Sequence, residues 1–126
     1  MSADPRMPAA PLTERQEARR RRILDASTRL ASAGGFDAVQ MREVAEISGV
    51  ALGTLYRYFP SKVHLLVATM EDQLGLLHEA LRTRPPAAMG AGERVAETLL
   101  RAFRALQREP LLADAMVRAL IFADRS

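Results

Sequence analysis

Residues 52–62 read LGTLYRYFPSK, a pattern typical of a short amphipathic helix followed by the start of another helix. At 100° per residue, Leu52, Leu55 and Phe59 fall on one side of the first helix, where they can be buried. The remaining positions form a polar surface made of Gly53, Thr54, Tyr56, Arg57 and Tyr58. A glycine for close approach, an arginine, hydroxyl groups and two rings suit a charged, hydrogen-bonding partner such as a DNA groove.

The residues before this helix complete a helix-turn-helix pattern. An apolar stripe at helical spacing predicts a short helix that carries Met41, Val44, Ala45 and Ser48. It ends at Gly49, and a turn of residues 48–50 separates it from the helix that begins near Leu52. Two helices joined by a short turn that contains glycine are typical of DNA-binding domains.

An earlier helix is predicted from its two ends. Thr13 and Gln16 form a capping box, in which the threonine side chain accepts from a backbone N–H and the glutamine side chain reaches back. The helix that follows runs to about Ala33 and is stopped by Gly34 and Gly35. Residues 1–12, which contain three prolines, are predicted to form a disordered arm.

Three further helices are predicted after residue 60. Ser61 caps a helix of about six turns, whose apolar stripe runs from Val63 to Leu81. The segment TRPPAAMGAG, residues 83–92, breaks that helix, and a fifth helix leads to a sixth that begins at Glu109-Pro110. Since no strand-like alternation appears, the predicted fold class is all-α. It comprises a DNA-binding domain over residues 13–62 and a helical regulatory domain over residues 63–126.

Composition excludes several classes of protein. The chain has 126 residues, 48% hydrophobic and 26% charged, as globular proteins do. It has no apolar run near the roughly 18–20 residues of a membrane span, and its N-terminus lacks the apolar core of a signal peptide. We therefore expect a cytoplasmic protein without membrane contact. With no cysteine and two histidines 14 residues apart, no metal site or cofactor is expected.

Residues 19–66, RRRRILDASTRLASAGGFDAVQMREVAEISGVALGTLYRYFPSKVHLL, resemble the DNA-binding domain of the TetR family of bacterial transcriptional regulators and cover it without a gap. Within that family, residues 38–66 and 109–124 resemble the KstR type, actinobacterial repressors of cholesterol and sterol catabolism. The resemblance implies a homodimer that binds an inverted-repeat DNA operator and is released by a hydrophobic effector. For this type the implied effector is a steroid acyl-CoA thioester.

The resemblance also implies that the regulatory domain is incomplete at Ser126, because members of the family continue with helices that complete the pocket and supply most of the dimer interface. The implied mechanism is a population shift. Ligand favours a state in which the helix of residues 63–81 has swung, so that the two recognition helices no longer fit major grooves about 34–36 Å apart.

The polar face of residues 52–58 supplies the main candidate DNA contacts. Arg57 is predicted to reach a guanine edge or a phosphate, the alternative being a solvated arginine. Tyr56 and Tyr58 either donate to phosphate or pack as rings. Gly53 allows close approach of the backbone, and Thr54 can donate to phosphate or touch a thymine methyl. Leu52 leans inward, so base contact and core packing both stay open for it.

Further contacts are predicted on either side of that helix. Lys62 lies in the first turn of the next helix, where its ammonium and the free backbone N–H groups can hold one phosphate. Gln40 and Arg42 begin the preceding helix and are predicted to face the other groove wall, although the family more often has threonine at the position of Gln40. Arg19–Arg22 form either a solvated face or a contact with the minor groove or backbone.

Apolar residues of the C-terminal half either form a core or line an effector cavity, which the resemblance favours. The candidates are Leu74, Leu77, Met89, Phe103, Leu106, Met116, Leu120 and Phe122. A TetR-type regulator of another pathway, such as efflux or fatty acid metabolism, is the alternative function. An acyl-CoA enzyme needs a nucleophile, base or phosphate loop that the sequence does not offer, so no enzyme is expected. A helical adaptor is the third possibility.

Overall fold

The computed structural model describes residues 11–125, so all but the last two residues of the predicted arm lie outside the described part. The described elements are α1 (Glu14–Gly34), the 3-10 helix η1 (Phe36–Ala38), α2 (Met41–Ser48), α3 (Leu52–Tyr58), α4 (Lys62–Thr83), α5 (Ala91–Arg108) and α6 (Pro110–Arg125). The predicted all-α fold class is therefore confirmed, and the one element that the sequence did not indicate is η1. No helix within residues 11–125 is long and apolar enough to cross a membrane.

The two predicted helix caps are present. Thr13 N donates to Gln16 Oε1 at 2.9 Å and Gln16 N donates to Thr13 Oγ1 at 3.2 Å, which is the reciprocal capping box. At the start of α4, His64 N donates to Ser61 Oγ at 3.2 Å. These bonds satisfy backbone donors that the first turn of a helix leaves without partners, so they fix where α1 and α4 begin.

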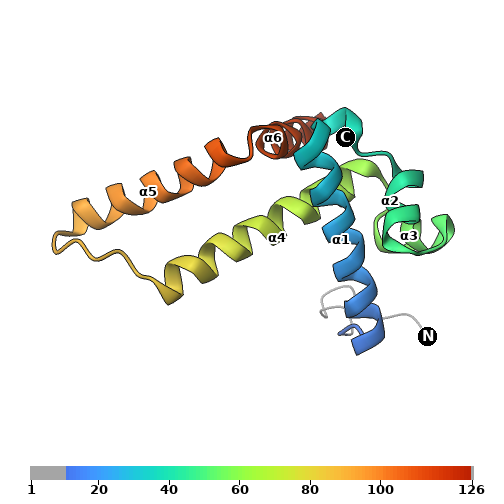
Figure 1. Cartoon of the computed structure of the whole chain (residues 1–126), viewed down its shortest axis with the longest axis horizontal. Coiled ribbons are helices and arrows are strands. Elements are labelled where there is room, and N and C mark those ends of the chain that lie inside the picture. Colours follow the sequence, from blue (N-terminus) through green and yellow to red (C-terminus); the bar gives the residue numbers. More distant parts are fainter. Residues whose placement is uncertain (1–10, 126) are drawn as a thin grey trace.

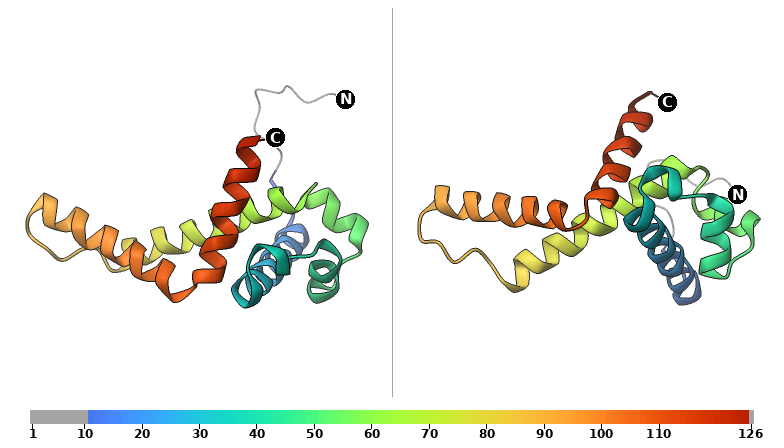
Figure 2. Two further views of the ribbon diagram at one scale, coloured as in Figure 1. Left: turned by 90° about the horizontal axis from the view of Figure 1, so that it is seen from above. Right: turned by 45° about the horizontal axis from the view of Figure 1, so that its top comes forward.

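The helices form a compact head and an extended arm. Figure 1 shows α1, α2 and α3 gathered around the N-terminal end of α4, which then leads away from them. Residues 84–90 reverse the chain, and α5 returns towards the head without burying any residue. The two views of Figure 2 show α6 crossing α4 beside α1, so the end of the sequence meets its beginning.

The core of the head includes residues from α6 as well as from α1 to α4. Its fully buried large side chains are Ile23, Leu24, Val39, Val44, Leu55, Leu65 and Leu66. Leu112, Ala115 and Ala119 of α6 belong to the same buried cluster. The chain therefore joins its C-terminal segment to the DNA-binding head through shared apolar burial rather than through the linker alone.

The apolar stripe of α4 is buried only at its N-terminal end, which differs from the continuous stripe that the sequence predicted. Leu66 is fully buried, but Leu74 is 56% exposed. Leu65 and Thr69, which do not belong to the predicted stripe, are fully buried. The reason is geometric: α1 and α6 both cross the N-terminal half of α4, whereas the distal half extends beyond them.

Candidate DNA interface and ligand cavity

The helix-turn-helix is closed by local backbone hydrogen bonds. Gly49 has a left-handed conformation, with φ 71° and ψ 31°. Its N–H donates to Glu46 O at 3.3 Å, and Val50 N donates to Ala45 O at 3.0 Å, a pattern that satisfies the last carbonyls of α2. Arg22 Nε of α1 donates to Ser48 O at 3.0 Å and so ties the turn to the first helix.

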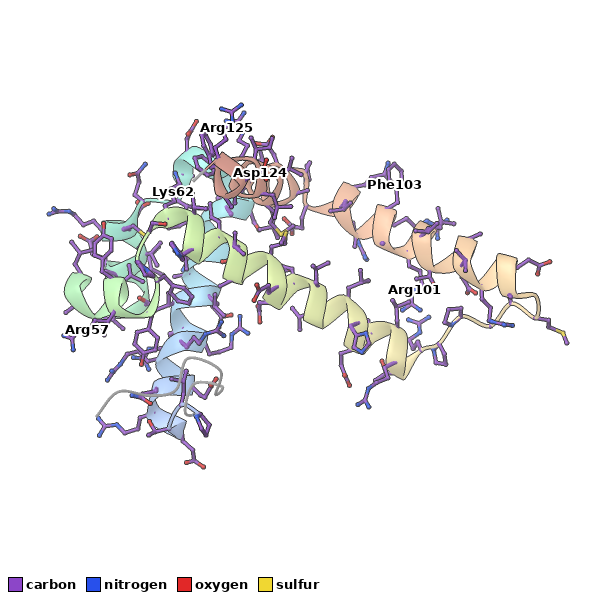
Figure 3. The ribbon with its side chains drawn as sticks, turned by 180° about the vertical axis from the view of Figure 1, so that it is seen from behind. Arg57, Lys62, Arg101, Phe103, Asp124 and Arg125 are labelled. Carbon is purple, nitrogen blue, oxygen red and sulfur yellow. The ribbon has the colours of Figure 1, made fainter. Side chains whose placement is uncertain are left out.

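Helix α3 buries one face and exposes the other. Leu55 and Phe59 are buried, and Leu52 packs partly against the same core. On the opposite side Tyr56 is 44% exposed and Arg57 is exposed. Figure 3 shows Arg57 pointing away from the body of the protein. Because α3 is anchored through its apolar face, its exposed face is held as a rigid surface.

The flanking residues of α3 differ in their surroundings. Gly53 is exposed, and a Cβ built on it would meet no heavy atom within 4 Å, so a partner can approach its backbone closely. Thr54 is half-buried at the edge of the helix. Tyr58 is also half-buried, and its ring centroid lies 6.4 Å from that of Phe59. The exposed surface therefore centres on Gly53, Tyr56 and Arg57.

Lys62 lies at the N-terminus of α4 and stacks on an aromatic ring. Its Nζ is 4.0 Å from the centroid of the Phe36 ring, a cation–π contact. Desolvation by burial lowers the pKa of Lys62, and the nearby charge of Asp37 partly opposes that effect. In turn, the Phe36 ring stacks on Phe122 of α6, with centroids 5.3 Å apart. Lys62 is thus linked through Phe36 to α6.

The start of α2 provides one committed and one exposed side chain. Gln40 precedes α2 as its N-cap residue, but its Nε2 donates to Asp37 O at 2.9 Å rather than its side chain capping the helix. Arg42 is exposed and has no ion pair with any residue between 11 and 125. Arg42 is therefore the side chain of the two that is not already engaged within the protein.

The arginine run of α1 mainly makes contacts inside the protein. Arg20 Cζ lies 5.6 Å from the centroid of the Phe59 ring, and Arg22 binds the turn as described above. Arg21 donates to both carboxylate oxygens of Asp72, at 2.6 and 2.7 Å. A charge run alone does not reveal such partners, because they lie in distant parts of the sequence.

A buried hydroxyl pair supports the same contact between α1 and α4. Thr69 Oγ1 donates to Leu65 O at 2.7 Å, so its oxygen accepts from Ser27 Oγ at 2.9 Å. Both side chains are fully buried. Polar groups removed from water need such partners, and together with Arg21 and Asp72 they fix the rotation of α4 against the head.

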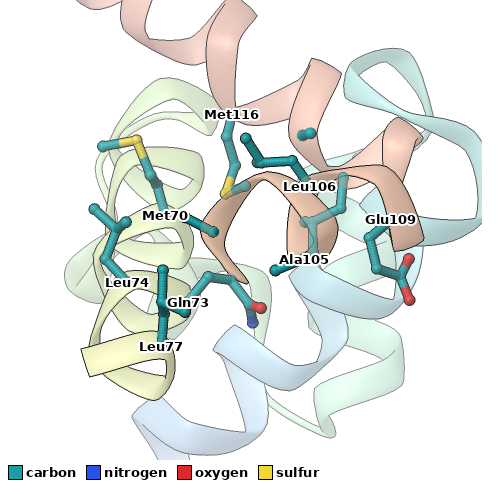
Figure 4. Close-up of a pocket in the computed structure, with 11 residues that line it drawn as sticks. Met70, Gln73, Leu74, Leu77, Ala105, Leu106, Glu109 and Met116 are labelled. Carbon is teal, nitrogen blue, oxygen red and sulfur yellow. The ribbon is translucent and has the colours of Figure 1, made fainter. Parts of the chain in front are cut away.

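Helices α4, α5 and α6 enclose an apolar cavity of about 170 Å³. Of the eight predicted ligand residues, Leu74, Leu77, Leu106 and Met116 line it, as Figure 4 shows. The sequence did not single out its remaining lining residues, which are Met70, Gln73, Ala102, Ala105, Glu109, Leu112 and Ala113. Several of them are small or polar, so apolar periodicity alone could not identify them.

The other four predicted ligand residues lie outside this cavity. Met89 sits in the loop between α4 and α5 and is 93% exposed. Phe103 is 57% exposed, and Figure 3 shows it on the side of α5 that faces away from α4. Phe122 stacks on Phe36, and Leu120 is partly exposed on α6. Among residues 11–125 no cluster of histidine and carboxylate side chains could hold a metal ion.

Comparison with known proteins identifies both ends of this architecture. Residues 23–69 match the description "Bacterial regulatory proteins, tetR family", and residues 90–126 match "Tetracyclin repressor-like, C-terminal domain". The chain is 52% identical to the HTH-type transcriptional repressor KstR of Rhodococcus jostii, over 88% of this chain and 51% of that protein. Identity to KstR of Mycolicibacterium smegmatis is 51%, over 90% of this chain and 56% of that protein.

A solved structure is similar as well. A TetR transcriptional regulator from Rhodococcus sp. RHA1 superimposes with a TM-score of 0.77 and 44% identity, covering 84% of this chain and 56% of that one. The chain spans about half the length of the curated relatives that it matches. These relatives are named as transcriptional repressors and not as enzymes, and the predicted resemblance is confirmed. The chain therefore belongs to the TetR family of bacterial regulatory proteins.

Proposed function

We propose that this protein is a transcriptional repressor that binds an operator through the exposed face of α3. The observation that carries the proposal is the placement of Arg57, which projects from a helix whose opposite face is locked into the core. Within residues 11–125 no carboxylate pairs with it. An unpaired guanidinium on a rigid helix can bind guanine or phosphate without first breaking an internal contact.

The surrounding residues complete a surface with the chemistry of a DNA contact. Gly53 allows the helix to approach the groove, Tyr56 offers an exposed hydroxyl, and Thr54 and Tyr58 flank it. Lys62 and Arg42 add positive charge on either side, suited to the phosphates of the groove walls. Gln40 and Leu52, one bonded to a carbonyl and one packed on the core, serve as positioning residues and peripheral contacts.

Operator binding is proposed to require a homodimer. An inverted repeat presents two equivalent half-sites, so a symmetric pair of heads binds it with both α3 helices in the major groove. The proposed division of labour assigns DNA binding to residues 13–62, and effector binding and dimerisation to the helices from residue 63 onward.

The proposed effector is a hydrophobic small molecule bound between α4, α5 and α6. The cavity there is lined mainly by aliphatic side chains and methionines, which adapt to apolar ligands of irregular shape. The resemblance to KstR-type regulators supports a steroid acyl-CoA as this effector and genes of sterol or lipid catabolism as the regulated set.

Effector binding is proposed to act on the head through α4 and α6, which line the cavity and also pack against α1. Ligand favours a state with a different separation of these helices and so shifts the population towards heads that no longer match the operator. The ring stack of Phe122 on Phe36, with Lys62 above it, supplies a second route from α6 to the DNA-facing end of α4.

A titration tests this function directly. The protein is added to fluorescently labelled DNA from its own upstream intergenic region at physiological salt, with unlabelled random DNA as competitor. Specific binding that a steroid acyl-CoA abolishes, while a straight-chain fatty acyl-CoA does not, supports the repressor and its effector class. Release by the fatty acyl-CoA alone points to fatty acid metabolism, and failure to bind any DNA at low salt contradicts the proposal.

A further inference from the structure

Four arginines surround an open depression of about 630 Å³ beside the apolar cavity. Arg101, Arg104 and Arg108 have helical spacings of three and four residues, which places them on one face of α5. Arg84, directly after the C-terminal end of α4, lines the same depression. The other lining residues are Leu77, Ala80 and Gln107, so no carboxylate takes part in its wall.

The charge of this arginine cluster is not neutralised by the part of the chain that the structure covers. Arg84, Arg104 and Arg108 form no ion pair with residues 11–125. Like charges three and four residues apart on a helix destabilise it, so this row has an energetic cost when it stands alone. An anionic ligand removes that cost, and arginine offers planar, paired donors for phosphate oxygens.

Arg101 has a structural role in the cluster. Its Nη1 donates to Arg84 O at 2.5 Å and its Nη2 donates to Ala80 O at 3.3 Å. Figure 3 shows Arg101 reaching from α5 towards the end of α4. These bonds hold the last turn of α4 against α5 and keep the guanidinium groups of Arg84 and Arg104 at a common site.

The arginine depression adjoins the apolar cavity. Leu77 lines both of them, so a single ligand can pass from one to the other. The cavity is lined mainly by apolar side chains, whereas the depression is basic. The depression also lies on the extended arm of α4 and α5, far from α3 (Figure 1), so it does not belong to the proposed DNA surface.

We propose that Arg84, Arg104 and Arg108 bind the phosphate groups of an amphipathic effector whose apolar body occupies the cavity between α4, α5 and α6. This inference rests on the proposed function and specifies how its effector is recognised. The diphosphate and 3′-phosphate of coenzyme A provide the anionic groups, and the acyl portion passes Leu77 into the cavity. The arginines therefore distinguish an acyl-CoA thioester from the corresponding free acid.

Calorimetric titration of the chain with three ligands tests the arginine site. The ligands are a steroid acyl-CoA, the same steroid as its free acid, and coenzyme A alone. The double variant R104Q/R108Q is compared with R29Q/R125Q, which removes the same net charge from exposed arginines outside the depression. We expect R104Q/R108Q to weaken thioester and coenzyme A binding at least about tenfold, leaving free-acid binding unchanged. The control variant should bind all three ligands like the unmodified chain.

The outcomes separate this inference from the proposed function. If coenzyme A binds and R104Q/R108Q loses it, while the steroid acid does not bind, the arginine site stands and the steroid effector falls. Equal weakening in both double variants overturns the site, because general charge then accounts for binding. Failure of coenzyme A and the thioester to bind the unmodified chain also overturns it, as does a loss of DNA affinity in R104Q/R108Q with unchanged ligand binding.

Discussion

Arg21 and Asp72 form a bidentate ion pair that joins α1 to α4, with Nη1–Oδ1 2.6 Å and Nη2–Oδ2 2.7 Å. The hydrogen bonds from Arg21 are the main cause of the lowered pKa of Asp72, and burial opposes them. Since α4 connects the head to the arm, this pair sets the angle at which the DNA-binding surface is held. A structural tie of this kind is also a place where that angle can change.

Asp72→Asn is expected to lower the free energy of unfolding by about 1 kcal/mol, a modest value because Arg21 remains partly exposed to water. The pKa of Asp72 is lower in the folded state, so the pair's contribution is present above the ordinary aspartate pKa. It is lost as the pH falls through the lowered value. Urea unfolding from neutral to acidic pH should show a gap between the two proteins that closes on acidification.

Asp25→Asn is the matched control for that experiment. Asp25 also pairs with Arg21, at 2.8 Å, but its side chain is 67% exposed. We expect a change within about 0.5 kcal/mol for this variant. Equal losses in the two variants would contradict the assignment of the Arg21–Asp72 pair as the structural tie.

Gly49→Ala is expected to destabilise the protein by about 1 kcal/mol, because Gly49 has a φ of 71° that is unfavourable for a residue with a Cβ. Gly75→Ala provides the opposite control. Gly75 lies inside α4 with open space around it, so alanine there should stabilise by up to about 1 kcal/mol. Thermal unfolding of both variants measures the difference, and effects of the same sign would contradict this account of the turn.

Two neighbouring leucines test whether α6 belongs to the core of the head. Leu112 is buried and Leu111 is 44% exposed. Leu112→Ala should cost about 2–5 kcal/mol, because it opens a cavity between α6 and the head. Leu111→Ala should cost much less. If urea unfolding shows similar losses for both, α6 does not pack on the head as described.

The ring stack between η1 and α6 is tested by replacing one aromatic ring with an aliphatic side chain. Phe122→Leu should lower the free energy of unfolding by about 1 kcal/mol through loss of the stack on Phe36. Phe103→Leu removes a ring that stacks on no other ring within residues 11–125, so it should be nearly neutral. Equal effects of the two substitutions in urea unfolding would show that the stack contributes nothing specific.

Local patterns predicted the helices well because their signals lie within a few residues of each other. The Thr13–Gln16 capping box, the left-handed Gly49 and the cap at Ser61 are examples. The face of α3 followed from helical periodicity, with Leu55 buried and Arg57 exposed. The family resemblance then placed these helices in a known order.

Long-range contacts could not be predicted from those patterns. Nothing near Arg21 in the sequence points to Asp72, 51 residues away, and nothing in α6 indicates that Leu112 enters the core of the head. The cavity was predicted from large apolar residues, yet Phe103 faces away from it because periodicity does not say which face of a helix meets a neighbour. Alanines that line the cavity carry too little apolar signal to be recognised.

The most direct test of DNA recognition by α3 is fluorescence anisotropy of labelled upstream DNA with the unmodified chain, Arg57→Ala and Arg29→Ala, at several salt concentrations. Arg29 is an exposed arginine of α1 and controls for loss of charge. The account predicts that Arg57→Ala loses roughly 1–3 kcal/mol of binding free energy, while Arg29→Ala binds like the unmodified chain. Unchanged binding of specific DNA by Arg57→Ala would contradict the central claim.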